Sequence, residues 1–118
     1  MPTDEILDPA VLAELRRAQE AYANPTFIQQ LAGLFQANTP GKMGRIREAI
    51  AARDAGTIEQ VAHTLKTNCA MLGATRMADA CWRVESAAAN ADLTAAAKAM
   101  EDAEAQLPLV LAALSALD

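Results

Sequence analysis

Aromatic residues are almost missing from this sequence of 118 residues, which contains two Phe, one Tyr and one Trp. β-Branched residues are also scarce, and these two groups are the ones that favour β-strands. Alanine, leucine and long polar residues, which favour helices, dominate instead. The sequence therefore predicts an all-α fold, and its length predicts one domain over residues 1–118.

Positive charge and long apolar runs are lacking as well. The formal net charge is −5, and no cluster of basic residues offers the positive face that nucleic acid requires. No stretch reaches the roughly 18 to 20 apolar residues of a membrane span, and the N-terminal residues have no signal-peptide pattern. The two cysteines, Cys69 and Cys81, match no zinc or redox spacing, so we interpret them as reduced core thiols. We therefore expect a cytoplasmic protein that binds neither membrane nor nucleic acid.

Helix start and stop signals divide the chain into one short and four longer segments. Asp8-Pro9 and Asn24-Pro25 are typical of helix starts. Thr39-Pro40-Gly41 interrupts the second segment, which is compatible with one kinked helix or with two helices. Pro108 predicts a kink in the last segment. We expect helices over about residues 9–19, 25–54, 57–72 and 75–90 and from about residue 92 onward.

The loops between these segments have only a few residues, and short loops join antiparallel neighbours. We therefore expect an antiparallel, up-and-down four-helix bundle with a short extra helix at its N-terminus. Its core covers about residues 25–115. We interpret the pair Arg45 and Arg47 as part of a solvated face.

His63 is the only histidine in the chain, and it does not fit the core pattern of its own helix. On a helical wheel it lies about 150° from the centre of the apolar stripe, so it should face solvent. Lys66 and Thr67 follow at i+3 and i+4 on the neighbouring surface. The apolar stripe consists of Ile58, Val61, Ala62, Leu65, Cys69 and Leu72.

An exposed imidazole beside a cation suits phosphoryl chemistry. A neutral imidazole nitrogen is a competent nucleophile, and Lys66 could neutralise part of the charge of a phosphoryl group on His63. The sequence has no Gly-rich phosphate loop and no nucleotide motif. The phosphoryl group must therefore arrive already activated on a partner.

The segment that begins at His63 resembles the histidine-containing phosphotransfer (HPt) domain family, whose pattern is H-x-L-K-G, small residues, Gly and a further helix. Here the matching residues are His63-Thr64-Leu65-Lys66, then Gly73-Ala74 and an apolar helix that ends in Val84-Glu85. The run 27–54 also resembles the long helix that precedes the family's histidine helix. The resemblance covers about residues 25–115.

The resemblance implies a phosphocarrier of a two-component phosphorelay and not an enzyme with its own ATP site. His63 would accept a phosphoryl group reversibly from an aspartyl phosphate on a receiver domain, and Lys66 would assist as a cation. The implied partners are receiver domains and a hybrid histidine kinase. We expect a monomer without a cofactor, because the Mg²⁺ of such relays belongs to the receiver's own acidic pocket.

The chain departs from the family pattern directly after the lysine, where Thr67 replaces the usual Gly or Ser. A larger, β-branched residue at this place would shift the choice of partner. The outer residues around His63 are candidates for the docking surface, and we interpret Gly73 as a structural glycine that lets the helix end against its neighbour. The candidate docking residues are Glu59, Gln60, Thr67, Ala70 and Met71.

Two other function classes compete with the phosphocarrier. A helical adaptor that binds a receiver or kinase without carrying phosphate would need neither His63 nor Lys66. A hydrolytic or metal enzyme is disfavoured, because one histidine provides neither a metal-ligand cluster nor a Ser/His/Asp constellation. We therefore predict no metal site.

Overall fold

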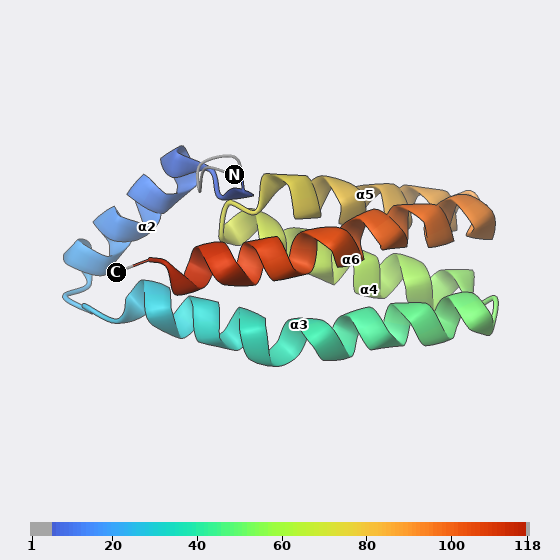
Figure 1. The fold of residues 1–118 in the computed structure, drawn as a ribbon, viewed down its shortest axis with the longest axis horizontal. Helices are drawn as coiled ribbons and strands as arrows, with labels where there is room; N and C mark the ends of the chain where they lie inside the picture. Colours follow the sequence, from blue (N-terminus) through green and yellow to red (C-terminus); the bar gives the residue numbers. More distant parts are fainter. Residues whose placement is uncertain (1–5, 118) are drawn as a thin grey trace.

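The computed structural model describes residues 6–117, and every regular element within them is a helix (Figure 1). This confirms the expected all-α fold. The helices are α2 (Pro9–Ala21), α3 (Phe27–Ala51), α4 (Ala55–Met71), α5 (Thr75–Ala89) and α6 (Leu93–Ser115).

The four longer helices, α3 to α6, lie side by side, and the chain reverses direction at each loop between them (Figure 1). The loops are residues 52–54, 72–74 and 90–92. Each helix packs against the next, and α3 also packs against α6, which closes the ring. The shorter helix α2 lies at one end of this assembly and is inclined to the other helices (Figure 1).

Aspartate side chains cap three of the helix starts. Asp8, Asp54 and Asp92 each accept a hydrogen bond from a backbone N–H of the first turn, which satisfies one of the donors that a helix start leaves open. The interpretation of Asn24 as the cap of α3 was wrong by two residues. Asn24 Oδ1 accepts from the backbone N–H of Thr26, and the helix begins at Phe27.

Two prolines lie inside continuous helices. α3 runs without a break through Pro40, and α6 runs through Pro108. Each proline removes one backbone donor and leaves the carbonyl four residues earlier without its helical partner. Both prolines are exposed, so water can reach the freed carbonyls. The second predicted segment is therefore one helix and not two.

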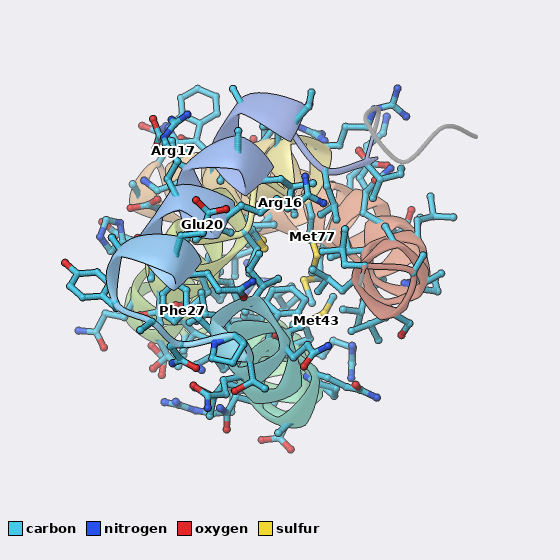
Figure 2. All side chains as sticks on the ribbon, turned by 90° about the vertical axis from the view of Figure 1, so that its left-hand side faces the viewer. Arg16, Arg17, Glu20, Phe27, Met43 and Met77 are labelled. Carbon is cyan, nitrogen blue, oxygen red and sulfur yellow. The ribbon has the colours of Figure 1, made fainter. Side chains whose placement is uncertain are left out.

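The core occupies the space enclosed by α3 to α6. In the view along the bundle, Met43 of α3 and Met77 of α5 point into this space (Figure 2), and they are 1% and 0% exposed. The stripe predicted for α4 faces the same space. Ile58, Val61, Ala62, Leu65, Cys69 and Leu72 are all buried.

Gly73 lies in the loop after α4, where the residues at the start of α2 pack against it. Its φ angle is +76°, a left-handed conformation that ends the helix and is costly for other residues. Its carbonyl accepts a hydrogen bond of 2.7 Å from the backbone N–H of Asp8. A Cβ atom on Gly73 would lie 3.1 Å from both Asp8 N and Val11 Cβ. Glycine therefore allows the N-terminal segment to pack against the α4–α5 loop.

Candidate functional site

His63 lies near the middle of α4 on its outer face. Its side chain is 59% exposed, whereas the neighbouring Ala62 and the following Leu65 are 0% exposed. The helical period produces this contrast, because the apolar stripe turns to the core and the next residue turns away from it. The imidazole is therefore accessible on a rigid element.

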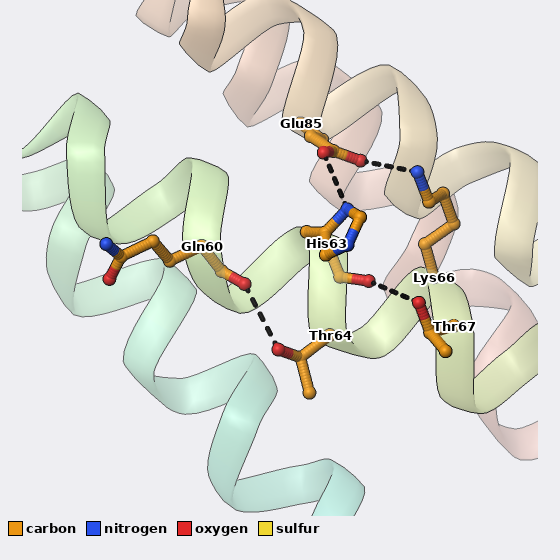
Figure 3. A network of polar contacts seen from close by, with 6 residues as sticks. All are labelled: Gln60, His63, Thr64, Lys66, Thr67 and Glu85. Atoms are coloured by element: carbon orange, nitrogen blue, oxygen red, sulfur yellow. Dashed lines mark hydrogen bonds and ion pairs between the residues drawn. The ribbon is translucent and has the colours of Figure 1, made fainter.

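A glutamate from the neighbouring helix holds the imidazole. Glu85 of α5 places Oε2 at 2.9 Å from His63 Nδ1 and Oε1 at 2.9 Å from Lys66 Nζ (Figure 3). The two carboxylate oxygens therefore bridge the residues that the sequence singled out. Among residues 6–117, no protein atom forms a hydrogen bond with the other ring nitrogen, Nε2.

The environment of Glu85 favours its ionised form. Partial burial, with 20% of the side chain exposed, raises the pKa of this carboxyl group. The hydrogen bonds and charges of Lys66 and His63 act in the opposite direction, and the resulting pKa lies below the usual value of 4.5. Glu85 is therefore a carboxylate at neutral pH, and Lys66 is its ion-pair partner.

The hairpin of α4 and α5 explains why these side chains meet. His63 lies eleven residues before Ala74 in the connecting loop, and Glu85 lies eleven residues after it (74 − 63 = 85 − 74). Residues at equal distances from the loop of an antiparallel helix pair lie opposite each other. The sequence interpretation quoted Glu85 only as the end of an apolar helix and assigned no role to it. This equal spacing was the signal that could have identified it.

All five candidate docking residues are exposed, but they do not form one cluster. Glu59 and Gln60 line a shallow depression that also contains His63 and Glu85. Thr67 donates its hydroxyl to the backbone carbonyl of His63 at 3.2 Å, so the hydroxyl points back to the helix (Figure 3).

Met71 lines a different, more apolar hollow between α3 and α4, together with Leu34. Ala70 is an exposed residue of α4. Gly73 lies beyond the end of α4, at the contact with Asp8.

Three further properties concern the part of the chain that the structure describes. Residues 6–117 contain no group of three or more His, Cys, Asp or Glu side chains that could hold a metal ion. None of the helices in this range is long and apolar enough to cross a bilayer. Cys69 and Cys81 are both buried and unbridged.

Comparison with known proteins gives two matches. A family model described as "Hpt domain" matches residues 30–117. The solved structure of histidine-containing phosphotransfer protein B (HptB) from Pseudomonas aeruginosa PAO1 is similar to this chain, with a TM-score of 0.84 and 24% sequence identity. That match covers 93% of this chain and 91% of the other. This likeness indicates a shared fold. No relative was found among curated proteins.

Proposed function

Because the chain belongs to the Hpt domain family, the histidine phosphotransfer proteins of phosphorelay signalling, we propose that His63 is its phosphoacceptor. His63 takes a phosphoryl group from an aspartyl phosphate of a receiver domain and passes it reversibly to another receiver. The observation that carries this assignment is the bridge from Glu85 to His63 Nδ1, which leaves Nε2 of an exposed imidazole free to react.

The carboxylate of Glu85 selects the reactive nitrogen. In a neutral imidazole one nitrogen carries the proton and the other carries a lone pair. Glu85 accepts the Nδ1 proton, so the lone pair resides on Nε2. This is the arrangement by which a carboxylate orients a catalytic histidine in hydrolases.

Transfer then requires no proton exchange. The Nε2 lone pair forms the bond to phosphorus, the bond from phosphorus to the aspartyl oxygen breaks, and its electron pair stays on the departing aspartate. The ring gains positive charge in this step, and the carboxylate 2.9 Å from Nδ1 stabilises it. In the reverse direction the same proton stays on Nδ1, which makes the ring a better leaving group.

Lys66 supplies the positive charge for the phosphoryl oxygens. Its ammonium group lies one helical turn from His63, and 29% of its side chain is exposed. An ammonium group has three N–H donors, and the ion pair with Glu85 engages at most one of them. The remaining donors can bind phosphoryl oxygens while the ion pair keeps the side chain in place.

The remaining parts of the proposal follow from the same role. The chain acts as a monomeric phosphocarrier that depends on receivers and a hybrid histidine kinase and has no ATP site of its own. It is one domain over residues 1–118, an antiparallel up-and-down four-helix bundle core at about residues 25–115 with α2 as the extra helix. A cytoplasmic location, where thiols stay reduced, is part of the same proposal.

The experiment is a transfer assay with phosphorylated receiver domains. Wild-type protein and His63→Gln are each incubated with a panel of receivers, and intact mass and acid stability of the product are measured. We expect a single acid-labile, base-stable phosphoryl adduct on the wild type and none on the variant. Detectable receiver binding without any adduct would instead support the helical adaptor.

A further inference from the structure

Two buried thiols face each other inside the α4–α5 hairpin. Cys69 of α4 is 0% exposed and Cys81 of α5 is 1% exposed, and neither is bridged. The S–H group of Cys69 donates a hydrogen bond to the sulfur of Cys81, so the two sulfur atoms are in direct contact. Neither thiol has a part in the chemistry proposed for His63. The pair is therefore a reactive group without an assigned role.

The packing of the two helices meets the distance requirement of a disulfide. α4 and α5 form the most extensive contact of any helix pair within residues 6–117. Helix axes that pack about 8–10 Å apart, with Cα atoms about 2.3 Å from each axis, bring facing Cα atoms to within about 3.5–5.5 Å. A disulfide requires Cα atoms about 4.4–6.8 Å apart. The two ranges overlap, so a bond between the sulfur atoms needs only a small adjustment of the helices.

The contact also gives the two sulfur atoms different roles. The hydrogen bond from Cys69 lowers the pKa of the Cys81 thiol, because it stabilises the thiolate, although burial acts in the opposite direction. The same contact and burial raise the pKa of the Cys69 thiol. The thiolate, and not the thiol, is the nucleophile that attacks an oxidant. Cys81 is therefore the sulfur that reacts first, and Cys69 is placed to complete the disulfide.

We propose that a hydroperoxide converts these thiols into a Cys69–Cys81 disulfide and that this modification slows phosphoryl transfer at His63. With hydrogen peroxide, the Cys81 thiolate attacks one oxygen, the O–O bond breaks, and the departing oxygen is protonated to water. The Cys69 sulfur then attacks the resulting sulfenic acid and displaces its hydroxyl group as a second water. Two thiols and one hydrogen peroxide thus give one disulfide and two waters. A thiol reductant reverses the modification by exchange.

Oxidation at this place depends on local opening of the hairpin. Cys69 lies two residues before the end of α4 at Met71, and helix ends open more readily than helix centres. Hydrogen peroxide is small and uncharged, so a brief opening is enough for it to reach the sulfur atoms. The thiols therefore stay reduced in a reducing compartment and are oxidised when hydroperoxide accumulates.

The disulfide lies close enough to the Glu85–His63 contact to disturb it. Cys69 follows His63 by six residues, about 9 Å along α4. Cys81 precedes Glu85 by four residues, about 6 Å along α5. A disulfide bond of about 2.05 Å is shorter than any contact between two thiols, so its formation shifts the helices relative to each other. The contact between Glu85 Oε2 and His63 Nδ1 is 2.9 Å, and a displacement of about 0.3 Å takes it to the edge of the normal hydrogen-bond range.

Tryptic digestion tests the disulfide directly. Trypsin cleaves after Lys66, Arg76 and Arg83, so the two thiols fall on the separate peptides 67–76 and 77–83. The full-length protein is treated with hydrogen peroxide, and its monomeric fraction is digested without reductant. We expect the two peptides to be joined, with the loss of two hydrogen atoms, and to separate on addition of dithiothreitol. Separate peptides, whether unmodified or oxidised to sulfinic acid, would overturn the pairing.

Transfer kinetics with a phosphorylated receiver test the effect on His63. The plateau rate of the oxidised protein should fall about twofold to fivefold, because the Glu85–His63 contact is weakened, and should recover with dithiothreitol. Dithiothreitol leaves methionine sulfoxide in place, so recovery assigns the loss to the thiols. Cys69→Ala and Cys81→Ala cannot form the disulfide, and each variant that is folded by circular dichroism should keep its rate after the same treatment. A disulfide without a change in the plateau rate, or an equal loss in these variants, overturns the effect on transfer.

The effect on transfer rests on the proposed phosphotransfer function, and the two fail in different ways. If the reduced wild type receives no phosphoryl group from any receiver, the function fails and the effect on transfer fails with it. The digest still decides whether the disulfide forms. If the reduced wild type is phosphorylated and oxidation leaves its transfer rate unchanged, only the redox inference fails.

Discussion

Replacing Glu85 by Gln isolates the charge of the bridging carboxylate. In the wild type, one carboxylate oxygen lies 2.9 Å from His63 Nδ1 and the other lies 2.9 Å from Lys66 Nζ. The amide of Gln keeps an acceptor beside His63 Nδ1 but removes the negative charge. A hydrogen bond to a charged group contributes about 1.5–3 kcal/mol and a neutral one about 1 kcal/mol. Because the imidazole is 59% exposed, we take the lower part of the difference. A loss of about 0.5–1 kcal/mol corresponds to transfer that is about twofold to fivefold slower.

The kinetic signature of this change is specific. The ring becomes positively charged only while the bond to phosphorus forms, so Glu85 stabilises the transition state more than the docked complex. We expect Glu85→Gln to lower the plateau rate of transfer and to leave the receiver concentration for half-maximal transfer unchanged. Rapid-quench measurements with a labelled, phosphorylated receiver separate the two quantities.

The control is Glu101→Gln, which removes the same charge from an exposed residue of α6 that has no ion-pair partner within residues 6–117. If Glu85→Gln and Glu101→Gln transferred at the same rate, the carboxylate would have no part in the reaction. An increase in the half-saturating receiver concentration alone would make Glu85 a docking residue and refute the positioning role.

The pKa of Glu85 sets the pH range of its effects. Its value in the folded protein lies below 4.5, the usual value, because its partners outweigh burial. The ion pairs therefore contribute stability that is fully present above pH 4.5 and is lost as pH falls through the lower folded pKa. We expect the stability difference between wild type and Glu85→Gln in urea to shrink as the pH falls below 4.5.

Two further predictions test the cation and the glycine. Lys66→Ala should lower the plateau rate at least about tenfold without changing receiver affinity, because the phosphoryl charge loses its nearest cation; an unchanged rate would remove Lys66 from the mechanism. Gly73→Ala should lower the free energy of unfolding by about 1–3 kcal/mol, because φ is +76° and a Cβ meets Asp8 at 3.1 Å. Gly33→Ala, with no atom near its Cβ, should instead stabilise α3 by up to about 1 kcal/mol in urea unfolding. Equal stabilities of these two variants would contradict the close packing at Gly73.

Local sequence patterns predicted those parts of the molecule that local forces determine. The scarcity of strand-forming residues predicted the helices, and the apolar stripe of α4 predicted that His63 faces outward, as its 59% exposure shows. These inferences need only the helical period and the burial of apolar side chains. They did not establish where α3 begins. The side chain of Asn24 accepts a hydrogen bond from the backbone N–H of Thr26, and both residues precede the helix.

The partners of His63 depend on helix register, which single-helix patterns do not contain. Glu85 is 22 residues away in sequence, and its place beside His63 is set by the length of the α4–α5 loop. Arg45 likewise looked like part of a solvated face, and its position beside Gln60 appears only when α3 and α4 are paired. A comparison of distances from each loop would have recovered both relations.

The reactivity of the two buried thiols can be used to measure opening of the α4–α5 hairpin. Cys69 belongs to the helix that presents His63, Cys81 belongs to the helix that presents Glu85, and both are at most 1% exposed. The contact with Cys81 and burial raise the pKa of the Cys69 thiol, so it resists alkylation while the two helices stay together. The rate at which a thiol reagent modifies the chain therefore reports how often the hairpin opens. A receiver that holds the hairpin closed would slow this rate, and the effect can be measured without any mutation.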